Sequence, residues 1–391
     1  MAISPVVPIY ARADITFEKG EGVYLYDTNG TRYLDFLAGI AVNSLGHAHP
    51  HMVEALTKQA KKIWHVSNIF YTEELNKFSK RLVDATFADT AFFCNSGTEA
   101  TEAGIKAVRK YFDENNEPDK YRIITFEGAF HGRTFGAIAA TGTPKVLEGF
   151  EPRLDGFDKV PLDIEAVKAA ITDKTAAIMI EPIQGESGIS ATPLKMLKEL
   201  RKICDEKNLL LYFDEVQCGV GRSGKLFAHE LENVTPDLVA IAKGIGGGFP
   251  LGGLLMKEKV GKALKTGSHG TTFGGNPLAM AVGNSVLDII LAPGFLQEVE
   301  RKGKLLKERL QALQQRHPHL IAEIRGHGLM LGIKMHDKFK NEDLKNNLLA
   351  NKLITNTAGD NVVRILPPLI IDESHIDEAI GIIDKTCGAM S

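Results

Sequence analysis

The sequence is poor in cysteine, in tryptophan and in long apolar runs. Its 391 residues include one tryptophan and four cysteines, Cys94, Cys204, Cys218 and Cys387, and no two of these form a CxxC pair. We therefore expect free thiols in a reducing compartment rather than a disulfide framework. The first twenty residues lack a basic stretch followed by an apolar core, and no apolar run approaches membrane-spanning length. These absences predict a soluble, cytoplasmic protein that does not bind a membrane.

Neither sign of charge is in excess. The chain carries 46 Lys and Arg against 49 Asp and Glu, a formal net charge of −3, so its electrostatics do not predict a nucleic-acid partner. The sequence also contains no GxSxG, HExxH or Walker motif, which leaves hydrolase, zinc-protease and P-loop functions without support. With 44% hydrophobic and 24% charged residues, the composition is ordinary for a globular protein, so the function must be sought in its motifs.

Two short apolar runs, Leu209–Phe213 and Leu238–Ala242, each end in a charged residue. Asp214 follows the first run and Lys243 follows the second. Runs of this length and composition are typical of buried strands in a parallel sheet. Ligands of open α/β sheets bind outside the carboxyl ends of such strands. We therefore expect the carboxylate and the lysine to face the same crevice.

The surroundings of Lys243 suit a reactive amine. An apolar run precedes the lysine, and the glycines of the following GIGGG segment allow a bulky group to approach the backbone. Burial lowers the pKa of a lysine and makes it available as a Schiff-base nucleophile. A carboxylate such as Asp214 can hold a pyridinium nitrogen protonated; at ~4 Å and a dielectric of ~20, such a pair is worth about 4 kcal/mol. A solvated Lys243 and a loop-capping Asp214 fit the spacing equally well.

Strands and helices alternate along the middle of the sequence. Apolar runs at 90–94, 121–126 and 175–180 end in polar or charged residues, and helical patterns cover 95–110 and 192–207. Strands separated by helices predict an α/β fold with a doubly wound, mainly parallel sheet.

The pattern changes toward both ends of the chain. Short extended segments and turns occupy residues 1–50, and a long amphipathic helix is predicted at 295–317. We expect a large domain over residues 51–287 and a small α+β domain over 288–391. The N-terminal segment is expected to join the small domain.

Residues 95–100, NSGTEA, place small hydroxyl residues and a glycine where a strand gives way to a helix. Free N–H groups and the helix dipole at such a point bind anions, so Ser96, Gly97 and Thr98 are candidates for a phosphate site. An ordinary helix N-cap with Glu99 nearby explains the same residues. Taken alone, the motif favours the cap.

Residues 219–224, GVGRSG, match the GxGxxG fingerprint of dinucleotide-binding proteins. This motif makes a nicotinamide-dependent dehydrogenase the alternative from a different functional class. Against it, residues 214–217 separate the strand from the glycines, no clear helix follows, and the fingerprint belongs in the first βα unit of such a domain. The dehydrogenase interpretation is therefore weak.

Three alternating histidines, His47, His49 and His51, suggest a metal site at first sight. Pro50 indicates a loop, in which alternate residues share no face, and no cysteine or carboxylate cluster completes the ligand set. We expect no metal site.

Further polar and aromatic residues follow or flank other predicted strands. The ring of Phe130 could stack on a flat cofactor and Arg133 could bind a carboxylate, although a core phenylalanine and a surface arginine are equally consistent. Glu181, Glu186 and Arg364 lie beside apolar runs. A structural salt bridge would explain these charges as well as catalysis does.

Together the motifs resemble those of the class III pyridoxal-phosphate-dependent aminotransferases of fold type I. The resemblance covers nearly the whole chain and is carried, in the family's order and approximate spacing, by NSGTEA (95–100), EPIQGE (181–186), DEVQ (214–217), AKG (242–244) and TFGGNPLA (272–279). Each motif is weak alone and the set is specific. The resemblance implies pyridoxal 5′-phosphate as cofactor, a large sheet domain with a small α+β domain, and a homodimer with shared active sites.

The resemblance also implies roles for individual residues. Lys243 would hold the cofactor covalently and carry the proton of transamination, and Asp214 would pair with the pyridine nitrogen. The remaining cofactor contacts would come from Ser96, Gly97 and Thr98 at the phosphate, Phe130 on the ring, Gln217 at the phenolic oxygen, and Thr272 at the phosphate of the neighbouring subunit's cofactor.

Within the family, residues 39–47, 67–71 and 130–134 resemble most the members that act on N2-acetylornithine. One departure is Ile69, where leucine is common, and this change is conservative. The implied reaction is transfer of the δ-amino group of N2-acetyl-L-ornithine to 2-oxoglutarate in arginine biosynthesis, giving N-acetyl-L-glutamate 5-semialdehyde and L-glutamate. Alternative donors within the family are N-succinyl-diaminopimelate, ornithine and 4-aminobutyrate.

This reaction implies four substrate-binding residues. By resemblance, Arg133 and Thr271 would contact acetylornithine, and Arg364 would bind an α-carboxylate. Glu186 would pair with Arg364 when the bound substrate brings no carboxylate there, and would swing away when it does.

Overall fold

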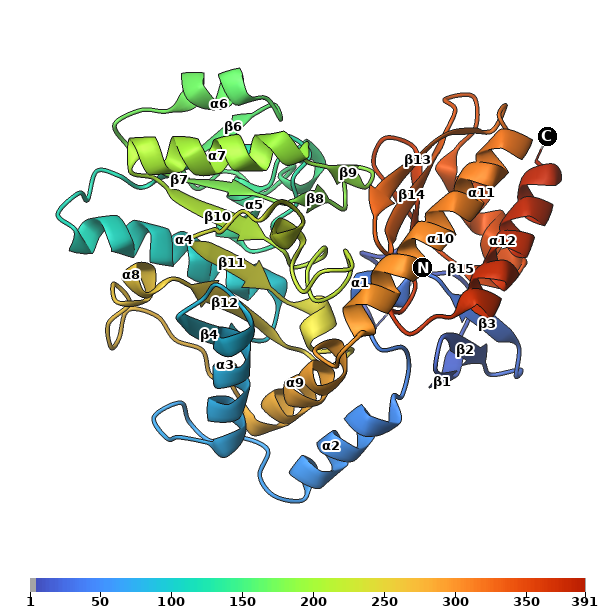
Figure 1. Ribbon diagram of the computed structural model, residues 1–391, viewed down its shortest axis with the longest axis horizontal. Helices are drawn as coiled ribbons and strands as arrows, with labels where there is room; N and C mark the ends of the chain where they lie inside the picture. Colours follow the sequence, from blue (N-terminus) through green and yellow to red (C-terminus); the bar gives the residue numbers. More distant parts are fainter. Residues whose placement is uncertain (1–4, 391) are drawn as a thin grey trace.

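The computed structural model describes residues 5–390 (Figure 1). Its centre is a seven-stranded sheet in which every pairing is parallel except the two made by β12. In spatial order the strands are β4 (Thr90–Cys94), β12 (Gly252–Met256), β11 (Leu238–Ile241), β10 (Leu210–Asp214), β7 (Thr175–Ile180), β5 (Arg122–Phe126) and β6 (Phe157–Val160). The predicted mainly parallel α/β sheet is confirmed.

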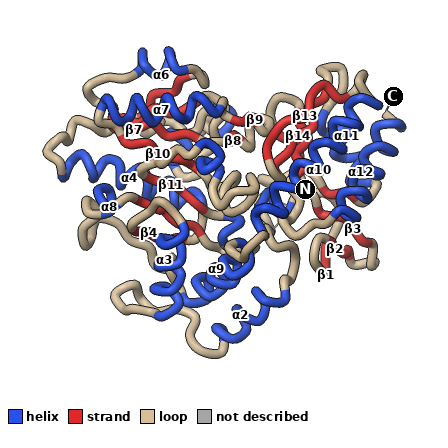
Figure 2. Tube along the Cα trace, viewed as in Figure 1, coloured by secondary structure: helices blue, strands red, loops and turns tan. Residues whose placement is uncertain are grey.

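Both faces of this sheet are covered by helices, as Figure 2 shows. Because successive side chains of a strand point to opposite faces, Leu210 and Tyr212 of β10 pack with one apolar cluster and Leu211 and Phe213 with another. The first cluster contains α4, and the second contains α7, α3 and α9. Burial on both faces explains why the strands are nearly uninterrupted apolar runs.

The helices of this part of the chain are α2 (Pro50–Ala60), α3 (Glu73–Ala85), α4 (Gly97–Glu114), α5 (Phe135–Ala140), α6 (Ile164–Ala170), α7 (Leu194–Lys207), α8 (Glu258–Gly261) and α9 (Pro277–Ile290). Short 3-10 turns occur at η1 (Pro144–Val146), η2 (Ala228–Glu232) and η3 (Lys243–Ile245), and a two-stranded ribbon is formed by β8 (Ile183–Gln184) and β9 (Ser190–Ala191).

The C-terminal part forms a second group of elements around an antiparallel sheet. Its strands, in spatial order, are β13 (Ile321–His327), β14 (Met330–Met335), β17 (Val362–Ile365) and β16 (Asn356–Ala358). Its helices are α10 (Phe295–Arg316), α11 (Asn341–Ala350) and α12 (Glu373–Gly388). The long helix predicted at 295–317 is therefore present.

The N-terminal strands form a third sheet with a strand from the far end of the chain. The order is β1 (Phe17–Glu21), β2 (Tyr24–Asp27), β3 (Arg32–Asp35) and β15 (Leu353–Ile354), and β3 runs parallel to β15. The segment that follows, α1 (Ala38–Ala41), is a turn of four consecutive residues with positive φ angles.

Within residues 5–390, no single helix is long and apolar enough to cross a membrane. The helices α9 and α10 meet the length and composition criteria only as a pair, and the pair is bent by 71°.

Candidate active site

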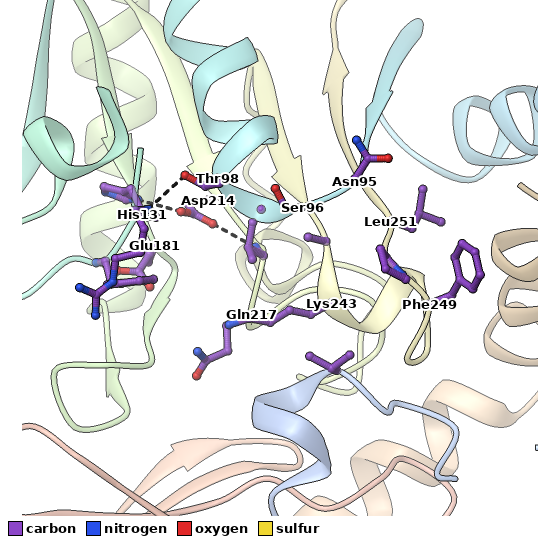
Figure 3. A pocket seen from close by; sticks show the side chains of 18 of the residues that line it. Asn95, Ser96, Thr98, His131, Glu181, Asp214, Gln217, Lys243, Phe249 and Leu251 are labelled. Carbon is purple, nitrogen blue, oxygen red and sulfur yellow. Dashed lines mark hydrogen bonds and ion pairs between the residues drawn. The ribbon is translucent and has the colours of Figure 1, made fainter. Parts of the chain in front are cut away.

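The two charged residues predicted at strand ends do lie beside the same cavity. Asp214 is the last residue of β10, and Lys243 follows the neighbouring strand β11 after one intervening residue. Both line a cavity of about 430 Å³ at the carboxyl ends of the strands (Figure 3). The parallel register of β10 and β11 produces this arrangement, because it brings the two strand ends to one edge.

Lys243 sits in a constrained backbone. Its φ angle is +50°, a conformation that is uncommon for residues other than glycine, and it opens the 3-10 turn η3. Burial lowers the pKa of its amine; the nearby carboxylate of Glu186 acts in the opposite direction, and the guanidinium of Arg364 lowers the pKa further. A lowered pKa leaves more of the amine neutral at a given pH, as a nucleophile or proton acceptor requires.

Asp214 is held from two sides. Its Oδ2 lies 2.7 Å from Nδ1 of His131, and its Oδ1 accepts a hydrogen bond from the N–H of Val216 at 3.0 Å. Asp214 and His131 are both buried, and Figure 3 shows the two side chains facing each other. These contacts fix the orientation of the carboxylate. No role was predicted for His131, although it stands between Phe130 and Gly132 in a motif already selected.

Glu181 is a second buried carboxyl group on the cavity wall. Its Oε2 accepts a hydrogen bond from the N–H of Phe130 at 2.9 Å. Burial raises its pKa well above the usual range, and the nearby carboxylate of Asp214 adds to this rise. Two carboxyl groups in one low-dielectric site do not both ionise easily, and the raised pKa of Glu181 favours its protonated form.

The NSGTEA segment forms the helix cap that its sequence allowed, and residues 95–98 line the cavity. Ser96 caps helix α4: its hydroxyl donates to Oε2 of Glu99 at 2.8 Å and accepts from the N–H of Glu99 at 3.3 Å. The hydroxyl hydrogen of Ser96 is therefore engaged. The N–H groups of Gly97 and Thr98 belong to the first turn and have no acceptor within the helix, and both residues line the cavity.

Two residues of the cavity lining, Gln217 and Gly97, indicate space and polarity suited to a ligand. Gln217 is buried, and its Oε1 has no hydrogen-bond partner anywhere in residues 5–390. A Cβ on Gly97 would come within 2.6 Å of the side chain of Val216, so only glycine allows this approach. A buried carboxamide oxygen without a hydrogen-bond donor suits a polar group of a bound ligand.

Phe130 and Arg133 lie at one side of the cavity. The guanidinium of Arg133 is 5.5 Å from the centre of the Phe130 ring, and Arg133 itself is exposed at the cavity edge. An exposed cation at the mouth of a mainly apolar cavity can bind the carboxylate of a substrate.

Glu186 and Arg364 form an ion pair that does not line this cavity directly. Their charged atoms lie 2.5 Å apart, and both charges act on the pKa of Lys243, which places the pair close to the reactive amine. Arg364 lies on β17, so the small antiparallel sheet contributes to the electrostatics of the site.

Thr271 and Thr272 lie outside the main cavity. Both line a neighbouring hollow beside Cys94 and Glu99, and Thr272 is exposed. The exposed apolar residues Ile69, Phe70, Tyr71 and Phe273 gather in the same region.

The two competing motifs do not form the sites they suggested. Residues 219–224 form turns that lead into no helix, unlike a dinucleotide fingerprint. His47 contacts Asp35 and His51 contacts Asp288, so the two histidines have different carboxylate partners.

Comparison with known proteins identifies the family. The family model for class-III aminotransferases matches residues 9–387. The chain is 54% identical to acetylornithine aminotransferase 1 of Bradyrhizobium diazoefficiens over 99% of this chain and 95% of that protein. The chain belongs to the class-III aminotransferases.

Solved structures agree with this assignment. An N-acetylornithine aminotransferase from Stenotrophomonas maltophilia superposes with a TM-score of 0.85 at 35% identity, covering 97% of each chain. An ornithine aminotransferase from Toxoplasma gondii, described with partial occupancy of PLP at its active site, gives a TM-score of 0.94 at 32% identity over 98% of this chain and 92% of that one. The fold is therefore that of the PLP-dependent aminotransferases, and neither comparison supports a dehydrogenase.

The cofactor of this aminotransferase is pyridoxal 5′-phosphate, on which the family depends. The cavity suits that molecule in four respects: free N–H groups at a helix start for its phosphate, the buried carboxylate of Asp214 for its ring nitrogen, the unpartnered carboxamide of Gln217 for a ring substituent, and the amine of Lys243 for its aldehyde.

Proposed function

We propose that this aminotransferase moves the δ-amino group of N2-acetyl-L-ornithine to 2-oxoglutarate in arginine biosynthesis, giving N-acetyl-L-glutamate 5-semialdehyde and L-glutamate. The main support is the name shared by bacterial and archaeal relatives at 45–54% identity, which are acetylornithine aminotransferases. Ornithine aminotransferases match the fold closely but at about 32% identity or lower. Ornithine, N-succinyl-diaminopimelate and 4-aminobutyrate remain the alternative donors.

Each of the main cavity residues has a separate role in the proposed transamination. When bound, the cofactor supplies an electron sink that stabilises negative charge at the substrate carbon. Nζ of Lys243, whose pKa is lowered by burial, would take the proton from that carbon and later return it. Asp214, whose orientation is fixed by His131, would pair with the ring nitrogen of the cofactor. Phe130 lines one side of the cavity, and the N–H groups of Gly97 and Thr98 would bind the phosphate.

The two substrates present different charges near the reacting carbon. The δ-carbon of acetylornithine carries only an amine, whereas the α-carbon of 2-oxoglutarate also carries a carboxylate. Pairing between Glu186 and Arg364 neutralises the arginine for the first substrate. Release of Glu186 frees the guanidinium for the carboxylate of the second. Arg133, with Thr271 from the neighbouring hollow, binds the carboxylate of acetylornithine.

We also propose that the enzyme is a homodimer in which Thr272 binds the phosphate of the partner subunit's cofactor. The position of Thr272 outside its own cavity, beside the exposed apolar residues Ile69, Phe70, Tyr71 and Phe273, supports this assembly. Sedimentation of the holoenzyme tests it, and a monomer at micromolar concentration would contradict it.

For the domains, we propose a large cofactor-binding domain over residues 51–287 and a small domain formed by 288–391 with 1–50, of which 1–4 and 391 lie outside the described residues. The pairing of β3 with β15 supports this division. Four unpaired cysteines support a cytoplasmic location.

The deciding experiment is parallel half-reaction kinetics with N2-acetylornithine, ornithine, N-succinyl-diaminopimelate and 4-aminobutyrate. We expect acetylornithine to have the highest specificity constant, at least tenfold above ornithine. A higher value for any of the other three donors would assign the enzyme to that donor instead.

A further inference from the structure

The loop that carries Arg133 is held by a hydrogen-bond network that the cofactor and substrate contacts do not explain. The network begins at Glu102, a partly buried residue on helix α4, and reaches the loop through two threonines. Oε1 of Glu102 accepts hydrogen bonds from the hydroxyl of Thr134, from the N–H of Gly136 at 3.1 Å and from the N–H of Ala137 at 3.3 Å. A single carboxylate oxygen therefore binds three donors of the segment that follows Arg133.

The two threonine hydroxyls complete the network. Thr98 Oγ1 accepts from the N–H groups of Arg133 at 3.1 Å and Thr134 at 3.3 Å, and lies 3.1 Å from Thr134 Oγ1. Because a hydroxyl has one hydrogen and two acceptor sites, Thr98 donates to Thr134, and Thr134 donates to Glu102. Thr134 also accepts from the N–H of Ala137 at 3.4 Å. Each hydroxyl then makes one donated and two accepted hydrogen bonds, which saturates both.

Two glycines make this close approach possible. A Cβ on Gly132 would lie 2.3 Å from Oγ1 of Thr98, and a Cβ on Gly136 would lie 2.6 Å from the carboxylate of Glu102. Gly132 also has a φ of +132°, which disfavours other residues. The backbone on both sides of Arg133 is thus shaped to receive the two side chains of α4.

We propose that Glu102 and Thr134 are positioning residues that hold Arg133 at the edge of the cavity and so determine the preference for a donor with an α-carboxylate. Arg133 is exposed, and its own N–H is bonded to Thr98, so its backbone is fixed while its guanidinium lies at the cavity edge beside the ring of Phe130, within reach of a ligand. A saturated network is rigid because breaking any one bond leaves a donor or an acceptor without a partner. Thr98 also lies in the first turn of α4, where the cofactor phosphate is proposed to bind. The same network therefore connects Arg133 with the proposed phosphate site.

This inference rests on the substrate role proposed for Arg133. The experiment compares two donors in the holoenzyme: N2-acetylornithine, and N-acetylputrescine, which lacks the α-carboxylate. The quantity measured is the ratio of their kcat/KM values. A loss of general stability lowers both values together, whereas displacement of Arg133 lowers only the value for acetylornithine.

We expect Glu102→Ala to reduce the ratio about tenfold and Thr134→Val about fivefold, through a higher KM for acetylornithine. Thr134→Ser, which keeps the hydroxyl, should restore the ratio to within twofold of the parent. The double variant Glu102→Ala, Arg133→Ala should lose no more than Arg133→Ala alone, because both changes remove the same interaction. Asp113→Ala, which removes an exposed carboxylate from the same helix, is the matched control and should leave the ratio unchanged.

The outcomes separate the two proposals. If Arg133→Ala leaves the ratio unchanged, the substrate role of Arg133 is wrong. If Arg133→Ala lowers the ratio but Thr134→Val and Glu102→Ala do not, the positioning role is wrong and the substrate role stands. Should Glu102→Ala fail to fold, Thr134→Val and its serine rescue decide the question.

Discussion

The carboxylate of Glu186 and the guanidinium of Arg364 are in direct contact, yet the two side chains differ in their access to solvent. The side chain of Arg364 is 2% exposed and that of Glu186 is 33% exposed. Movement of Arg364 would require the small sheet to open, whereas Glu186 can leave the pair through the solvent-facing side. The geometry thus favours a fixed arginine and a mobile glutamate.

This asymmetry predicts that Glu186→Gln affects the two half-reactions unequally. Without the carboxylate, Arg364 stays charged and unpaired beside a donor that brings no carboxylate to it. We expect the acetylornithine half-reaction to slow at least tenfold, while the 2-oxoglutarate half-reaction changes by less than threefold. Stopped-flow measurement of each half-reaction checks this, with Glu323→Gln, at an exposed pair with Arg325, as control. Equal slowing of both half-reactions would reject the switch.

The ionisation of Lys243 should respond to the same pair in opposite directions. Glu186 raises the pKa of this amine and Arg364 lowers it. We therefore expect Glu186→Gln to move the acidic limb of cofactor uptake to lower pH, because the neutral amine persists further into acid. Arg364→Met should move that limb to higher pH. The rate at which apoenzyme takes up pyridoxal 5′-phosphate, followed from pH 6 to 10, measures both shifts; shifts of the same sign would be inconsistent with this electrostatic picture.

The contact between His131 and Asp214 predicts a loss of cofactor affinity when the histidine is removed. In His131→Phe, the buried carboxylate loses a partner at 2.7 Å. A hydrogen bond to a charged group is worth about 1.5–3 kcal/mol, so we expect the Kd for pyridoxal 5′-phosphate to rise roughly 10- to 100-fold by equilibrium dialysis. Asp214→Asn, which removes the charge itself, should raise it further. An unchanged Kd in His131→Phe would mean that Asp214 is oriented without the histidine.

Glu181 predicts a pH-dependent difference in stability. Its pKa is raised in the folded protein, so the folded state holds a proton that the unfolded chain releases near pH ~4.3. The stabilisation from that proton is present below this pH and is lost as pH rises toward the folded pKa. Glu181→Gln has no such loss. The free energy of unfolding of this variant, minus that of the parent, should therefore increase as the pH rises above about 4.3. Urea unfolding at several pH values tests this, and parallel curves would contradict it.

The sequence predicted the parts of the fold that local patterns encode. The strands ending at Asp214 and preceding Lys243 are apolar runs because both faces of the sheet are covered, and their parallel arrangement brings the two residues together. Strand β12 was not predicted, because Gly252-Gly253-Leu254-Leu255-Met256 continues a glycine-rich stretch. Its place in the sheet depends on antiparallel pairing with β4 and β11, and no local pattern reports such pairing.

The site residues show the same limit. Motifs identified Lys243 and Asp214, but the pairing of Asp214 with His131 joins side chains 83 residues apart and could not be read from spacing. The sequence allowed the hydroxyl of Ser96 either to cap α4 or to lie near a phosphate; in the structure it caps α4, donating to the carboxylate of Glu99 and accepting from the N–H of Glu99. The orientation of such a hydroxyl depends on which nearby acceptor receives its single hydrogen, and this is not encoded in the spacing of the motif.

The parallel pairing of β3 with β15 has a consequence for how the protein is made. Leu34 and Asp35 emerge from the ribosome early, but their neighbours Leu353 and Ile354 are synthesised near the end. The three N-terminal strands therefore exist with the β3 edge unpaired until the C-terminal segment is made, and an unpaired edge invites pairing with other chains. Misassembly during translation should accordingly concentrate on these strands, and the last step of folding should be their capture by the C-terminal segment.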